Sequence, residues 1–333
     1  MKIELIFALI LVVTFGMTVI GLKFLIPFLL SQKIGQKILD IGPRWHKNKE
    51  GTPTMGGISF IIASFISLCI FLMIASKHIE IKVLLLILNI FVYALLNAMV
   101  GIIDDFAKFR KKKNEGLKPF SKFAFQGIAA IFFLVSLKFT IGIDTFLFIP
   151  FINVSIDLGF FYYIFAFLAL CGVVNGVNLT DGIDGLASSI TLTVGIFFAV
   201  IAIMITQDVS LTFFSAVLIG ATLGFLMYNF YPAKIFMGDT GSLFLGALVV
   251  SVSFIINNVL LVLIYGFVFI VEALSVILQV LVFKITKGKR LFKMAPLHHH
   301  LEKCGMSEIK IVLLLTLVNI GTCVLAFWGL GNL

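Results

Sequence analysis

Long apolar runs separated by short polar loops follow one another along this chain from end to end. A helix needs about 20 apolar residues to cross the roughly 30 Å hydrocarbon core of a bilayer, and the runs are of this kind. The pattern predicts an all-α fold: a polytopic integral membrane protein with about ten transmembrane helices, in a single transmembrane domain over residues 1–333. The expected spans lie near residues 3–30, 54–76, 83–103, 120–140, 159–177, 185–206, 209–229, 242–256, 259–284 and 309–331.

The number of spans depends on Asn257 and Asn258, which interrupt an apolar stretch from 242 to 284. As one helix, this stretch would be about twice as long as a bilayer requires. If it is split, and the N-terminus lies outside, four cytoplasmic loops hold 19 of the 25 Lys and Arg residues. Cytoplasmic loops carry such an excess, so we expect both termini to be extracytoplasmic. These loops are 31–53, 104–122, 229–241 and 284–308.

Composition narrows the classes of function. Hydrophobic residues make up 61% of the chain and charged residues only 12%, whereas a soluble domain is about 25% charged, so a soluble globular protein is excluded. The net charge of +9 lies mostly in loops and reflects membrane orientation, so it gives no support to nucleic-acid binding. The four cysteines show no disulfide or zinc spacing. The first run, 3–30, lacks a cleavage site and is interpreted as a retained span.

Five of the sixteen acidic residues fall at predicted cytoplasmic ends of spans. Asp104 and Asp105 close the third span, Asp181 and Asp184 precede the sixth, and Asp239 precedes the eighth. Acids at a membrane boundary are common, and the pair at 104–105 alone would mean little. An ionisable group near hydrocarbon is costly unless it is paired or hydrated. Because the three segments emerge on one face, the five side chains can converge into a functional site.

The segment from Asn175 to Ala187 ends one span and begins the next with almost no loop. Asn178 and Asp181 can cap exposed backbone N–H groups, and Gly182 leaves room where a ligand approaches. The N-terminus of the following helix also attracts anions. A tight helical hairpin is the alternative interpretation, but two aspartates in an intramembrane turn are more than a hairpin needs.

The segment Met237–Ser242, preceded by Asn229, again combines glycines with a carboxylate. Mg²⁺ prefers oxygen ligands and is typically held by one or two carboxylates together with substrate phosphates. Asp239 is therefore the first candidate for a Mg²⁺ ligand. The sequence contains no Walker A motif and no Rossmann glycine pattern, so ATP-driven transport and nicotinamide chemistry lose support.

Three consecutive histidines, His298, His299 and His300, lie in the loop 284–308 of a chain with only five histidines. A zinc site needs spaced ligands, so contact with phosphate or proton transfer suits this motif better. A solvated polar loop is the alternative.

Two lysines and one glutamate complete the candidate residues. Lys108 lies one helical turn beyond Asp105 and Lys122 lies at the entrance to the fourth span, so both are placed to meet a phosphate. The run Lys111–Lys113 has a simpler interpretation as an anchor to anionic lipid. Glu272 is an isolated acid at membrane depth, and it is either a functional group or an internal partner within the bundle.

Taken together, these motifs resemble the polyprenyl-phosphate N-acetylhexosamine-1-phosphate transferases, and within that superfamily the phospho-N-acetylmuramoyl-pentapeptide transferases. The aspartate pair and the segment 178–185 are shared across the superfamily, whereas 51–57 and 295–300 favour the muramoyl branch. The matching segments are His46–Gly57, Asp104–Asp105, Asn175–Ala187, Asn229–Ser242 and Met294–Glu302.

The resemblance implies transfer of phospho-MurNAc-pentapeptide from UDP-MurNAc-pentapeptide to undecaprenyl phosphate, a membrane lipid. The products are lipid I and UMP, in the first membrane step of peptidoglycan synthesis. It also implies dependence on Mg²⁺, a homodimer, and a multi-pass enzyme of the bacterial cytoplasmic membrane with its active site facing the cytoplasm. The residues matching catalytic positions are Asp104, Asp105, Asp239, His298, His299 and His300. The candidate substrate-binding residues are Lys49, Thr54, Lys108, Lys122, Asn178, Asp181, Asp184 and Asn229.

Two alternatives for the mechanism stay open. In the first, the lipid phosphate attacks the diphosphate directly, and Asp104 or Asp105 removes a residual proton. In the second, one of these aspartates acts as a nucleophile and forms a covalent intermediate in a two-step route. Two other functions also compete. A secondary transporter would place its acids near the bilayer midplane, and a sister transferase would use UDP-GlcNAc.

Overall fold

The computed structural model describes residues 2–32, 49, 51–75, 79–111 and 116–330. Within these residues, ten helices are long and apolar enough to cross a membrane, as the hydropathy pattern predicts. They are α1 (Ile3–Ser31), α2 (Gly57–Ala75), α3 (Ile81–Lys111), α4 (Pro119–Thr140), α5 (Phe160–Thr180), α6 (Leu186–Ile201), α7 (Val209–Asn229), α8 (Gly238–Ile255), α10 (Phe267–Ile285) and α12 (Glu308–Trp328). The span that contains α6 continues to Thr206. The shorter elements are η2 (Ala202–Thr206), η3 (Val259–Leu261), α9 (Val262–Tyr265), α11 (Leu297–Lys303), β1 (Phe146–Ile149) and β2 (Val154–Asp157).

Helices α7 and α8 form the buried centre of the bundle, and most of their residues are hidden from the surroundings. Small residues allow the neighbouring helices to pack closely, as is usual in membrane bundles. A Cβ added to Gly220 of α7 would lie 2.8 Å from the carbonyl oxygen of Leu11 in α1, and one added to Gly224 would lie 2.9 Å from the Cβ of Thr18. The small-xxx-small spacing of these two glycines therefore joins α1 to the core.

Helix α8 packs even more closely against α3 and α2 at the end that carries the aspartates. A Cβ on Gly101 of α3 would lie 2.3 Å from the carbonyl oxygen of Asp239, and one on Gly57 would lie 2.3 Å from Gly241 Cα. The backbone of α8 can approach its neighbours here only because these positions lack side chains. This packing places the first turn of α8 beside the last turns of α3.

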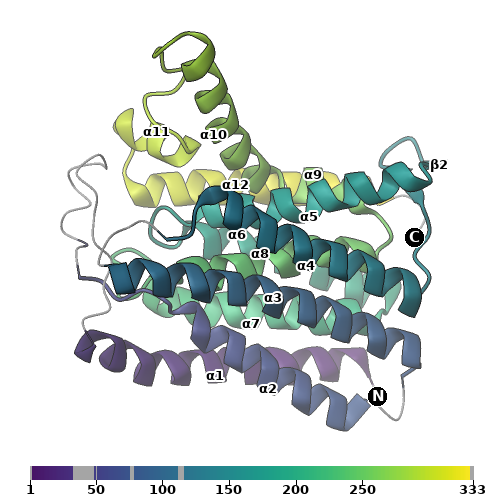
Figure 1. Ribbon diagram of the computed structural model, residues 1–333. Coiled ribbons are helices and arrows are strands. Elements are labelled where there is room, and N and C mark those ends of the chain that lie inside the picture. The colour runs from purple at the N-terminus through teal and green to yellow at the C-terminus, as the bar shows by residue number, and fades with distance from the viewer. Residues whose placement is uncertain (1, 33–48, 50, 76–78, 112–115, 331–333) are drawn as a thin grey trace.

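The ninth span is interrupted. The sequence predicts one helix over 259–284, but the chain forms η3 and α9 and then turns at Gly266 before α10. Figure 1 shows α10 projecting away from the bundle and carrying α11 back toward the start of α12. Many side chains of α10 are apolar and exposed, including Ile277 and Leu281.

The two ends of the bundle differ. The start of α1, the end of α12 and the β1–β2 hairpin lie at one end, to the right in Figure 1, and α3 ends at the other. The hairpin is antiparallel and pairs Phe146 with Asp157 and Ile149 with Val154. It was not predicted from the sequence: β1 is uniformly apolar, and β2, although its apolar and polar residues alternate, has only four residues.

Candidate functional site

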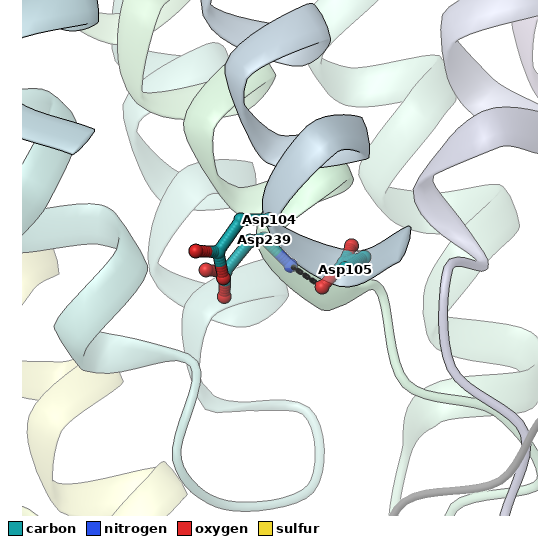
Figure 2. A group of neighbouring side chains, drawn as sticks. All are labelled: Asp104, Asp105 and Asp239. Carbon is teal, nitrogen blue, oxygen red and sulfur yellow. Dashed lines mark hydrogen bonds between the residues drawn. The ribbon is translucent and has the colours of Figure 1, made fainter. Parts of the chain in front are cut away.

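Three aspartates from α3 and α8 form the centre of the site. Asp104, Asp105 and Asp239 each offer a carboxylate oxygen, and these oxygens all lie within 4.8 Å of one another. Figure 2 shows Asp104 beside Asp239, with Asp105 reaching the backbone of Asp239 from the other side. Asp104 and Asp105 are almost completely buried, whereas the Asp239 side chain is 17% exposed. Asp239 is thus the most accessible of the three carboxylates.

Asp105 caps the start of α8. Its carboxylate accepts the backbone N–H of Asp239 at 3.2 Å, the backbone N–H of Thr240 at 2.9 Å and the Thr240 hydroxyl at 2.8 Å. The first N–H groups of a helix have no partner within the helix, and a carboxylate satisfies them well. Gly238 has φ +71°, and a Cβ there would lie 2.6 Å from Asp105. The absence of a side chain at Gly238 therefore allows Asp105 of α3 to cap the start of α8.

Asp104 holds the chain that follows α3. Its carboxylate accepts the backbone N–H of Leu117 at 2.7 Å, and Gly116 packs so tightly that a Cβ would lie 2.4 Å from the same oxygen. The other Asp104 oxygen lies 2.8 Å from the Lys108 ammonium one turn later in α3. Asp104 thus shares the site with Lys108 and also orders the approach to α4.

Two lysines and an amide surround Asp239. The ammonium groups of Lys108 and Lys122 lie 3.0 Å and 2.6 Å from the same Asp239 oxygen. Asn178, in the last turn of α5, donates to the other Asp239 oxygen at 3.1 Å and to Ser242 at 2.8 Å, and it accepts from Lys122 at 3.1 Å. Helices α3, α4, α5 and α8 therefore each contribute a polar side chain to one cluster, which contains Lys108, Lys122, Asn178 and Asp239.

The donor set of this cluster fits a hard divalent cation. Three carboxylates with oxygens this close repel one another, and the two nearby ammonium groups offset only part of their negative charge. Carboxylate oxygens are the ligands that Mg²⁺ prefers. The partly exposed carboxylate of Asp239 is the one best placed to meet both a cation and a phosphate.

A second ionic group lies around Lys49. Its ammonium is 2.6 Å from Asp184 and 2.5 Å from Glu308 at the start of α12, and it lies 5.8 Å from the centre of the Tyr231 ring. Asp184 also accepts the backbone N–H of Ala233 at 2.9 Å. This group ties the segment before α2, the turn between α5 and α6, and α12 together.

Thr54 and Asn229 lie beside these groups. The Thr54 hydroxyl would lie 3.1 Å from a Cβ on Gly238, which places it next to the start of α8. Asn229 is buried, accepts the backbone N–H of Gly185 at 3.1 Å and donates to the Ile235 carbonyl at 2.9 Å. Asn229 therefore braces the turn that carries Asp181 and Asp184.

Asp181 lies in that turn and is only partly buried. Burial, followed by the negative charges of Asp239, Asp105 and Asp184, raises the pKa of Asp181 to about 8. The positive charge of Lys108 acts in the opposite direction, but its effect is smaller than that of burial and of these carboxylates. The turn thus places a carboxyl group that is easily protonated between the two clusters.

The three histidines have three different environments. His298 is fully buried, and its Nδ1 lies 3.1 Å from Glu272 of α10. His299 Nδ1 lies 2.6 Å from Glu302, and His300 Nδ1 accepts the backbone N–H of Lys293 at 3.1 Å. A Cβ on Gly182 would lie 2.2 Å from His298 Nε2. The histidine motif therefore reaches the Asp181–Gly185 turn through His298.

Some of these partners were not predicted. Glu308 follows Ser307 at the start of a helix, an ordinary position for an acid, and the sequence contains no signal that it meets Lys49. For Glu272 the sequence left two interpretations, and the structure shows that it pairs with His298. His46 and Lys112–Lys113 lie outside the described residues, as does the Lys111 side chain.

Comparison with known proteins agrees with this geometry. The model of glycosyl transferase family 4 matches residues 87–257, and a signature of phospho-N-acetylmuramoyl-pentapeptide transferases matches residues 49–61. The transferase of that name from Listeria welshimeri is 43% identical over 96% of this chain and 93% of its own length. Those from Clostridium novyi and Staphylococcus carnosus are each 42% identical, over 96% and 95% of this chain and 95% and 97% of their own lengths. The resemblance found in the motifs is confirmed, and the chain belongs to the phospho-N-acetylmuramoyl-pentapeptide transferase family.

Proposed function

We propose that this protein transfers phospho-MurNAc-pentapeptide from UDP-MurNAc-pentapeptide to undecaprenyl phosphate, forming lipid I and releasing UMP. The observation that carries this function is the convergence of Asp104, Asp105 and Asp239 with Lys108 and Lys122 at one end of a membrane bundle. The reaction must bring a lipid phosphate and a nucleotide diphosphate together. A site of mixed charge at the membrane boundary suits that task.

Electrostatics dominate the proposed chemistry. A phosphate monoester already carries a charge of about −1.5 to −2 near pH 7, so its oxygen needs little help from a base. The obstacle is repulsion between the two anionic substrates. Lys108 and Lys122 offset that repulsion and stabilise the charge that develops on the leaving phosphate. Asp104 or Asp105 then removes any residual proton, and Asp105 also fixes the start of α8.

Mg²⁺ fits the same cluster. Asp239 would be its main protein ligand, with the nearest oxygens of Asp104 and Asp105 close enough to take part after a small movement. When bound, Mg²⁺ supplies positive charge that polarises the phosphate oxygens. The ammonium groups of Lys108 and Lys122 both contact one oxygen of the Asp239 carboxylate.

The nucleotide and sugar would lie along the turn between α5 and α6. We assign Lys49, Thr54, Asn178, Asp181, Asp184 and Asn229 to this side of the site, because all of them lie in or against the turn, the motif around Asp239, or the segment before α2. The histidine motif approaches the same turn from α11. It is placed to contact the diphosphate or to move a proton.

We further propose a location in the bacterial cytoplasmic membrane, with the site facing the cytoplasm, and assembly as a homodimer. The location is supported by the positive charge of the loops beside the site, which is typical of cytoplasmic loops. The dimer rests on the resemblance to the family.

The test is UMP release by the detergent-purified protein supplied with undecaprenyl phosphate and UDP-MurNAc-pentapeptide, in Mg²⁺ or in EDTA. We expect release that needs the lipid and is lost in EDTA. Release with UDP-GlcNAc, and none with the muramoyl donor, would move the protein to the sister activity. Absence of release with either donor would contradict the transferase and favour transport.

A further inference from the structure

A buried carboxylate holds His298 in one orientation. Glu272 and His298 are 1% and 0% exposed. The His298 ring nitrogen Nδ1 lies 3.1 Å from Glu272 Oε2, and the His298 backbone N–H donates to the two carboxylate oxygens at 3.2 and 3.3 Å. Glu272 thus contacts both the ring and the backbone of the same residue. Rotation of the ring would break the contact between Nδ1 and Glu272, whereas the bond from the His298 backbone N–H would keep the carboxylate in place.

The other ring nitrogen has no partner within the described residues. His298 Nε2 is buried and makes no hydrogen bond there, which is unfavourable for a polar atom in a folded protein. It faces Gly182, where even a methyl group would lie 2.2 Å away. The next charged residues along that turn are Asp181 and Asp184. The unpartnered nitrogen is therefore aimed at the segment that joins the two ionic groups of the site.

The chemistry of the pair fixes which atom is available. An ionised carboxylate can only accept hydrogen bonds, so a hydrogen bond between ionised Glu272 and His298 Nδ1 requires the proton on Nδ1. Nε2 is then the ring atom without a partner among the described residues, and it faces Gly182. In metal and catalytic sites, a carboxylate behind a histidine commonly fixes the ring in this way.

We propose that Glu272 is a positioning residue for the transfer reaction, acting through His298, whose Nε2 is the atom that contacts the substrate beside Gly182. This rests on the proposed function. A pair that served only to stabilise the fold would have no reason to leave Nε2 unsatisfied and directed at a glycine.

The test is a double-mutant cycle on kcat for UMP release. We expect Glu272→Gln, which keeps the shape of the side chain, to lower kcat by about 10- to 100-fold with little change in the KM of the donor. In a His298→Ala background the same substitution should cost less than about twofold, because its effect passes through the missing ring. Gly182→Ala should also lower kcat, because its methyl group occupies the space that Nε2 faces.

The control is Ser275→Ala, one turn further along α10, whose buried hydroxyl donates to the Glu272 backbone carbonyl. It should leave kcat within about twofold of the wild type in either background. An equal loss for Glu272→Gln in both backgrounds, or normal activity of Gly182→Ala, would overturn the proposal. If the wild-type protein releases no UMP, it is the proposed function that fails, and this result is distinct from a failure of the role proposed for Glu272.

A measurement that needs no activity covers the case in which Glu272→Gln does not fold. In wild-type protein with ¹⁵N-labelled histidine, we expect a signal that disappears in His298→Ala and that shows a proton on Nδ1. A proton on Nε2 alone would overturn the proposal, because Glu272 could not then hold the ring as described.

Discussion

At the scale of single residues, Asp239 carries the first prediction, since the ammonium groups of Lys108 and Lys122 both lie within 3.0 Å of one of its oxygens. We expect Asp239→Asn to lower UMP release by at least about 100-fold, because a neutral amide neither holds the lysines nor offers a charged oxygen to a cation. Thermal unfolding should stay close to the wild type. The matched control is Asp208→Asn at the start of α7, where asparagine also caps a helix well. Near-normal turnover of Asp239→Asn would contradict the assigned role.

Asp181 gives a prediction for pH. Its pKa of about 8 lies above the ordinary value of 3.8, so the folded protein binds a proton there more tightly than the unfolded chain does. The stability that this provides is fully present below about pH 4 and is lost as the pH rises through 8. We expect the Tm of Asp181→Asn relative to the wild type to rise between pH 5 and 9, because the amide has no charge to bury. A difference in Tm that is constant with pH would show that Asp181 titrates normally.

At the scale of elements, the sequence predicted the ten spans, but it did not predict how far their helices continue into polar sequence. The third span was placed at 83–103, yet α3 continues to Lys111 and carries Asp104, Asp105 and Lys108 on helical turns. Hydropathy marks where a helix leaves hydrocarbon, whereas backbone hydrogen bonds continue into the polar boundary. In the same way, α8 begins at Gly238 rather than at 242, so Asp239 lies in its first turn.

From the order of the spans, the sequence predicted which residues share one end of the bundle, but not which of their side chains contact each other. Positions at one membrane face suggested that the five aspartates converge, and three of them do so within 4.8 Å. The pairing of Lys49 with Glu308, across 259 residues of sequence, depends on how α12 packs. The pairing of Glu272 with His298 depends on the turn of the chain between α10 and α11. Neither contact follows from periodicity or from local spacing.

The close contact of α3 with α8 can be tested directly. We expect Gly101→Ala to lower both Tm and UMP release, because its methyl group would lie 2.3 Å from the Asp239 carbonyl and push the two helices apart. Overpacking of this kind costs about 1–3 kcal/mol. Gly172→Ala in α5 is the matched control, since nothing lies within 4 Å of its added Cβ. If the two variants behave alike, the approach of these helices is looser than described.

At the scale of the whole molecule, the chain concentrates its ionisable chemistry at one end of a bundle whose centre is apolar. The buried helices α7 and α8 separate the aspartate cluster from the β1–β2 hairpin at the opposite end. A transporter would need its acids near the middle of the bundle. The proposed reaction brings a nucleotide-linked substrate to a lipid and needs its acids toward one end of the bundle, and Asp104, Asp105 and Asp239 lie toward the end at which α3 finishes and α8 begins.

The direction in which this end faces can be measured with the native cysteines. Cys304 is exposed beside α11, whereas Cys171 and Cys323 are buried and Cys69 lies within α2. With the site in the cytoplasm, a membrane-impermeant maleimide should leave Cys304 unlabelled in intact cells and label it after permeabilisation. Ser155→Cys in the exposed strand β2, made in a Cys304→Ser background, should be labelled in intact cells. The reverse pattern would place the aspartate cluster outside, where a cytoplasmic nucleotide donor could not reach it, and would contradict the proposed reaction.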